Sequence, residues 1–258
     1  MRKSSLCLGL AFAVLSPISQ VSVVAQEKPG NVIMIREITP KSGARQQLEQ
    51  GLKQLATWRA SIKDPQANVV FEQITGEKKG IYALVSRGMH WADFDKPPAP
   101  PAEARAEFDK AIGDTVASGA LRLYEELPKL GHEGDPNMKQ PYQFYEVETF
   151  HVPLGKEDRF SAAVARFREA IEKTKDHVDF TCIVLAEGGQ YGTWAFVFGH
   201  AKAAEFAGPY PDEILKQAFG AAEAKSIVDE FAAVSGGFFT EEVIQYRPDL
   251  SYFPGEAK

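Results

Sequence analysis

The sequence GEKKGIYALVSR at residues 76–87 returns in outline as GGQYGTWAFVFG at residues 188–199. A repeat of this length indicates a duplicated domain rather than the short unit of a solenoid. Two copies must share one fold, so the architecture of one half predicts that of the other. The identical positions, each pair 112 residues apart, are Gly76/Gly188, Gly80/Gly192, Ala83/Ala195, Val85/Val197, Ala92/Ala204 and Phe94/Phe206.

Each copy is expected to run strand, helix, strand, strand, helix, strand. In the first copy, residues 32–38 are β-like and residues 67–75 and 80–87 form a hairpin across a glycine-bounded turn. The glycines mark positive φ angles and not a phosphate cradle, because a strand rather than a helix follows them. The hydrophobic stripes that predict the first helix of each copy are Leu48, Leu52 and Leu55, and Phe160, Val164 and Phe167.

The order βαββαβ is that of a ferredoxin-like α+β unit, an antiparallel sheet with helices on one face. We expect a first unit at residues 26–135 and a second at residues 136–258. The uncovered face of one sheet needs an apolar partner, and a tandem copy supplies it. The fold class is therefore α+β, with two tandem ferredoxin-like units whose sheets face each other as an intramolecular barrel.

On this element order and duplication, residues 31–250 resemble the dimeric α+β barrel superfamily. The superfamily includes antibiotic-biosynthesis-type monooxygenases, haem-degrading monooxygenases, stress-responsive barrel proteins and chlorite dismutase-like proteins. The resemblance implies a fold and leaves the function open. It makes haem a candidate cofactor, because haem-binding members use an axial histidine, commonly from a helix.

Residues 1–25 have the pattern of a cleaved signal peptide: Arg2 and Lys3, an apolar run, and small residues before Gln26. The apolar run is too short for a membrane anchor, so we expect a periplasmic or secreted protein. Cleavage leaves 27 basic against 35 acidic residues, a net charge of −8, which disfavours nucleic acid as a partner. Cys182 is the one cysteine of the mature chain, and its apolar neighbours predict a buried, inert thiol.

No catalytic signature is present: His-x-x-x-His, Cys-x-x-Cys and Gly-x-Ser-x-Gly spacings are all absent, and no metal ligand set is visible. His151 is the sharpest candidate, because it ends the first strand of the second copy. An offset of 113 would place it opposite Ile38 and would place Thr149 opposite Arg36. The alternative is that Arg36 and His151 lie near strand ends and reach water.

His200 follows the third strand of the second copy, and either lines a pocket or begins a solvent-facing helix. Trp194 corresponds to Tyr82 of the first copy, so it either packs in the barrel or stacks on a flat ligand. Tyr191 lies in the preceding turn. We expect a pocket mainly in the second copy, with ligand-binding residues His151, Trp194, His200, Tyr191 and Arg36. Phe94 and Phe206 should be equivalent buried anchors of a short helix.

Three functions remain open. The first is binding of a small organic ligand, between sheet and helices of one half, without evident catalysis. The second is a cofactor-independent or haem-degrading type of monooxygenase. The third is a non-catalytic envelope module that docks through Tyr246, Tyr252 and Phe253. The sequence leaves open whether the chain is a monomer or a homo-oligomer.

Overall fold

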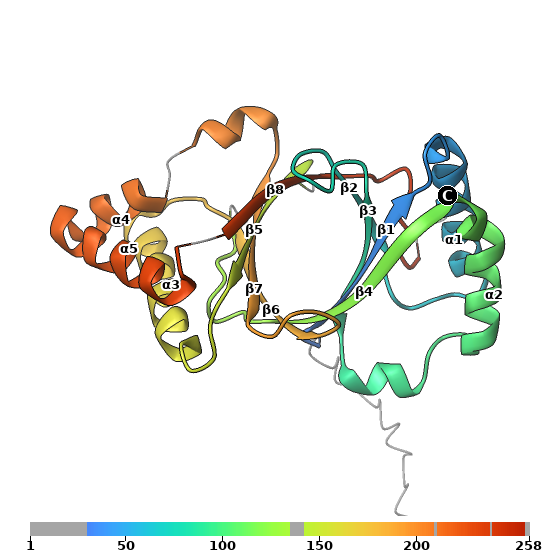
Figure 1. Ribbon diagram of the computed structural model, residues 1–258, viewed down its shortest axis with the longest axis horizontal. Helices are drawn as coiled ribbons and strands as arrows, with labels where there is room; N and C mark the ends of the chain where they lie inside the picture. The colour runs from blue at the N-terminus through green and yellow to red at the C-terminus, as the bar shows by residue number, and fades with distance from the viewer. Residues whose placement is uncertain (1–29, 135–141, 209–210, 238, 256–258) are drawn as a thin grey trace, which may run out of the picture.

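The chain folds into two consecutive α+β halves (Figure 1). The computed structural model describes residues 30–134, 142–208, 211–237 and 239–255, so the expected signal peptide at residues 1–25 lies outside the described residues. The first half contains β1 (Val32–Pro40), α1 (Arg45–Ser61), β2 (Val69–Gln73), β3 (Tyr82–Met89), η1 (Trp91–Asp95), α2 (Pro101–Ile112), η2 (Gly113–Thr115) and β4 (Val116–Glu126). The second contains β5 (Phe144–His151), α3 (Glu157–Thr174), β6 (Phe180–Glu187), β7 (Thr193–His200), η3 (Ala203–Ala207), α4 (Pro211–Phe219), α5 (Ala221–Ser235) and β8 (Phe239–Tyr246).

All eight strands form one closed antiparallel barrel in the order β1-β3-β2-β8-β5-β7-β6-β4. Within each half the strand order is that of a ferredoxin-like unit, and the halves join where β2 pairs with β8 and β4 pairs with β6. Each half therefore contributes its second and fourth strands to the two seams, and no sheet edge stays open. The predicted tandem barrel is confirmed, with the helices of each half on its outside (Figure 1).

The repeated glycines occupy the turns that the sequence predicted. Gly76 and Gly80 have φ of 77° and 89°, and Gly188 and Gly192 have φ of 90° and 76°. A β-carbon on Gly192 would lie 2.1 Å from the carbonyl oxygen of Val152, so this site also requires close backbone approach. The glycines recur because both hairpins need left-handed backbone that other residues adopt at a cost.

The interval of 112 residues also holds along the first strands. Ile38 pairs with Tyr82, and Phe150 pairs with Trp194, which is the repeat partner of Tyr82. Ile38 is thus equivalent to Phe150, and both face the helices. The offset of 113, which opposed Ile38 to His151, is wrong because it matches an outward-facing residue with one on the other face of the strand.

The same register makes Arg36 equivalent to Glu148. Arg36 pairs with Leu84 of β3, and Glu148 pairs with Phe196 of β7, again 112 residues apart. The expected correspondence of Arg36 with Thr149 is therefore also wrong. Two opposite charges occupy equivalent places, each on the sheet face that its own helices cover.

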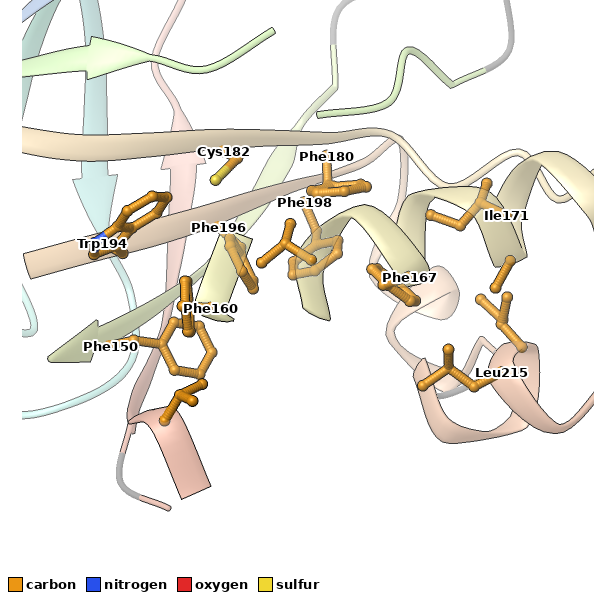
Figure 2. Close-up of a cluster of buried hydrophobic side chains, with 14 of the residues drawn as sticks. Phe150, Phe160, Phe167, Ile171, Phe180, Cys182, Trp194, Phe196, Phe198 and Leu215 are labelled. Carbon is orange, nitrogen blue, oxygen red and sulfur yellow. The ribbon is translucent and has the colours of Figure 1, made fainter. Parts of the chain in front are cut away.

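The layer between sheet and helices is apolar in both halves, but its composition differs. In the first half it is mostly aliphatic, with the predicted Leu48, Leu52 and Leu55 all buried. In the second half it is an aromatic cluster between α3 and the sheet (Figure 2). Phe160 is 0% exposed, and its ring centre lies 5.1 Å from that of Trp194. Such packing stabilises the fold by about 2 to 3 kcal/mol for each fully buried ring.

The burial of Cys182 is confirmed at 1% exposed, but several other expectations are wrong. Phe94 is 38% exposed and Phe206 is only half-buried, because the short helices η1 and η3 bury none of their residues against the core. The second long helix of the second half is two helices, since Gly220 breaks it with φ of 83°. Tyr252, expected in a docking patch, is 5% exposed and donates its hydroxyl to the carbonyl of Asp64 at 2.7 Å.

None of the helices in the described part of the chain has the length and apolarity needed to cross a bilayer.

Candidate functional site

The sequence-predicted site residues do not converge on one pocket. His151 lies at the end of β5, with its Nε2 atom 3.2 Å from Nε2 of Gln190 in the turn before β7. Tyr191, in the same turn, is 63% exposed and donates its hydroxyl to Glu157 at 2.7 Å. Trp194 points to the other side, into the aromatic cluster beneath α3, as Figure 2 shows. Of these candidates, only His200 borders a group of ionisable side chains.

Three carboxylates gather on the outer face of the sheet in the second half. Glu146 and Glu148 are two residues apart on β5, so they share one face, and Glu241 of β8 lies directly across from Glu148. One oxygen from each lies within 4.8 Å of the others. Glu146 and Glu148 are partly buried, whereas Glu241 is exposed, so the cluster is accessible from solvent on its β8 side. We call Glu146, Glu148 and Glu241 the carboxylate cluster.

His200 extends this group along the sheet. Its Nε2 atom lies 3.4 Å from a carboxylate oxygen of Glu146, but the angles are not those of a hydrogen bond. That nitrogen is buried and has no hydrogen-bond partner among the described residues. The imidazole ring packs 4.4 Å from the ring of Phe206, which in turn lies 6.0 Å from Phe144. The site therefore joins polar acceptors to an aromatic edge.

Glu148 is the most perturbed group of the cluster. Burial, followed by repulsion from Glu146 and Glu241, raises its pKa to about 7. The strand pairing gives it no cationic neighbour, since Phe196 and Glu241 lie on either side. A carboxyl group poised near neutral pH can accept or give a proton under physiological conditions, which is the requirement for general acid–base chemistry. Strongly perturbed groups of this kind are more frequent at functional sites than elsewhere.

The carboxylate cluster is also the one group of the described residues whose His, Cys, Asp or Glu side chains could share a metal ion. Hard oxygen ligands suit magnesium, calcium or manganese, and a nearby imidazole would suit iron or zinc. Two of the carboxylates repel the third in the free protein, so a cation would relieve that repulsion. Exposed acidic groups commonly lie together without a metal, and the geometry alone does not assign one.

The residues present do not fit a haem. The sheet–helix layer of the second half is filled by rings, with Phe150 and Phe196 centred 4.9 Å apart and Phe180 and Phe198 5.6 Å apart. Of the five histidines, all of them in the described part of the chain, none lies on a long helix, α1 to α5. His200 faces Glu146, and the carboxylate cluster would repel haem propionates. No step below is routed through haem.

The sequence analysis missed the carboxylate cluster although its signal was present. Glu146 and Glu148 alternate on a predicted strand, and matching Ile38 with Phe150 would have placed both on the helix-facing side. Glu241 and Glu242 were correctly expected on opposite faces. The neighbour of Glu241 is Glu148 of another strand, which only the strand pairing reveals.

Arg36, the remaining predicted residue, lies in the other half. Its guanidinium stands 4.9 Å from the ring centre of Phe108 on α2. Burial, together with the nearby charge of Arg59, lowers its pKa, although the group stays positive. Arg36 therefore cannot take part in the same site as His200.

No family model and no curated protein sequence match this chain. Solved structures share its fold. A protein from Fusobacterium nucleatum, provisionally described as a monooxygenase, has a TM-score of 0.56 at 7% identity and covers 84% of this chain and 93% of its own. One from Lactobacillus acidophilus, described in the same way, has a TM-score of 0.54 at 10% identity, covering 89% and 98%. An anthrone oxidase-like protein has a TM-score of 0.53 at 12% identity, covering 90% and 95%. At these identities the likeness shows the fold alone.

Proposed function

We propose that this protein binds a small aromatic compound carrying hydroxyl donors, on the outer face of the second sheet, with Glu148 as the principal acceptor. The observation that carries the proposal is the buried Glu148 carboxyl, set between two other carboxylates with no described cation to neutralise it. Leaving such a group unpaired costs stability, which a ligand that donates hydrogen bonds would recover.

The surroundings favour an aromatic ligand over a sugar or a peptide. Phe144 and Phe206 lie at the His200 end of the cluster, and aromatic rings pack edge-to-face or offset against one another. The unpartnered Nε2 of His200 adds a second polar contact beside these rings. Glu241 leaves the opposite end open to solvent, which gives a ligand a way in.

The test is calorimetric titration with 2-naphthol and, as the matched compound without a hydroxyl donor, 2-methoxynaphthalene. We expect 2-naphthol to bind and the methyl ether to bind at least about tenfold more weakly, the loss for one charge-assisted hydrogen bond. Glu148→Gln should weaken 2-naphthol binding by a similar factor, and Glu77→Gln, at an exposed turn residue, should leave it unchanged. Equal affinity for the two compounds would refute the proposal. A titration with manganese alone tests whether the cluster holds a metal instead.

A second candidate function is oxidation of the bound compound without a cofactor, favoured by the pKa of Glu148 near 7. Neighbouring folds include proteins provisionally described as monooxygenases and an anthrone oxidase-like protein. Glu148 would remove the acidic C–H proton of an anthrone, and dioxygen would then oxidise the carbanion. The balanced reaction is anthrone plus O₂ giving anthraquinone plus water. Anthraquinone formation that stays at the background rate with the wild-type protein would exclude this activity.

We also propose that the protein is exported and acts in the periplasm or outside the cell, because residues 1–25 carry the signal-peptide pattern. Mass determination of the protein recovered from its native host tests this. A mature chain beginning at Gln26 supports export, and an intact Met1 contradicts it.

A further inference from the structure

Arg36 is a positive charge without a counter-ion in the first half. Among the residues that the structure describes, it makes no ion pair and no hydrogen bond, and its one contact of either charge type is with the ring of Phe108. Its neighbour Arg59 is already paired with Asp64. The partly buried guanidinium keeps its charge but has lost part of its hydration, which is unfavourable unless an anion completes the site.

The surface beside Arg36 is apolar. Leu121 lies directly across from Arg36 on β4, faces the same side and is 44% exposed. Farther along that face, Trp91 is anchored by a 2.9 Å hydrogen bond from its indole nitrogen to Glu125. Strand rise places Glu125 about 13 Å beyond Leu121. An exposed aliphatic and aromatic strip therefore extends from the charged group toward η1.

This strip occupies the place in the first half that the carboxylate cluster occupies in the second. Arg36 is the repeat equivalent of Glu148, and each is a partly buried charge on the helix-facing side of its sheet. The two copies have thus diverged to opposite charge at one position of a shared architecture. Opposite charges at equivalent positions favour ligands of opposite character.

We propose that the first half binds a small aromatic carboxylate, with the carboxylate on Arg36 and the rings along Leu121 toward Trp91. A guanidinium matches a carboxylate in a planar, bidentate arrangement, and the apolar strip suits the ring system. This site is separate from the one proposed for hydroxyl donors in the second half, and neither depends on the other.

The experiment is calorimetric titration of the full-length mature protein with 2-naphthoate, with 2-naphthol as the uncharged compound of the same ring size. We expect Arg36→Met to weaken 2-naphthoate binding at least about tenfold, as for loss of a charge-assisted pair. Arg105→Met is the matched control, since Arg105 is 84% exposed on the same half. Glu148→Gln should leave 2-naphthoate binding intact, so that failure of the second-half site would not be mistaken for failure of this one.

Thermal unfolding separates binding from a structural role. Because Arg36 has no described counter-ion, Arg36→Met should melt at the same temperature as the wild type or higher. Should that variant not fold, Leu121→Asp places a repelling charge on an exposed position and should abolish 2-naphthoate binding. The inference is overturned if wild-type protein does not bind 2-naphthoate, if Arg36→Met binds it equally well, or if inorganic phosphate competes fully with it.

Discussion

Replacement of Glu148 by glutamine should stabilise the protein at neutral and alkaline pH. The folded protein raises the pKa of Glu148 from 4.5 to about 7, so it holds this proton more tightly than the unfolded chain does. The contribution of Glu148 to stability therefore falls as pH rises from 4.5 to 7 and levels off above 7. A displacement of this size corresponds to about 3 kcal/mol, shared among three coupled carboxylates. Glu148→Gln removes that loss, because an amide does not ionise and can donate to Glu146 or Glu241.

The assay is urea denaturation followed by circular dichroism at a series of pH values. We expect the excess stability of Glu148→Gln over wild type to be near zero at pH 4 and to reach about 3 kcal/mol at pH 8. Glu77→Gln controls for loss of one negative charge from an acidic protein, since Glu77 is exposed. The reasoning fails if the two variants have equal stability at pH 8, or if Glu148→Gln is less stable than wild type there.

Four further outcomes are expected. Phe160→Ala should destabilise the fold by about 3 to 5 kcal/mol in denaturant melts, since the ring is fully buried among other rings; a loss below about 1 kcal/mol would place it at the surface. Cys182, whose pKa burial raises to about 12, should react with a thiol reagent only after unfolding, and fast labelling of native protein would contradict its burial. Arg247 holds the pKa of Glu49 at about 2, which gives stability above pH 4.5 that is lost as pH falls toward 2; Arg247→Met should raise the pH midpoint of acid unfolding, and an unchanged midpoint would refute this. Haemin should give no Soret band characteristic of axial histidine ligation, and such a band would show a site that the aromatic packing does not allow.

The fold could be predicted from the sequence because duplication displays the same signals twice. Gly76 with Gly188 and Gly80 with Gly192 fix two hairpins, and the stripe at Leu48 fixes a helix. Closure of the barrel follows from the need of each sheet to cover its inner face. The break at Gly220 was not predicted, because an isolated glycine is tolerated inside many helices.

The candidate site could not be predicted, because it depends on which side chains meet across strands. A one-residue error in register moves every side chain to the other face, and the offset of 113 did so for β5. His151 then took the place that belongs to Phe150, and Glu148 was overlooked. Glu241 joins Glu148 through a pairing between strands that lie far apart in the sequence, for which one chain carries no local signal.

The account is tested most directly by carbon-detected NMR titration of the Glu148 side-chain carboxyl, in the free protein and with 2-naphthol bound. It predicts a midpoint near pH 7 for the free protein and a change in that midpoint when the hydroxyl donor binds. A midpoint near 4.5 that 2-naphthol leaves unchanged would show an ordinary solvated carboxylate and would contradict the proposed site.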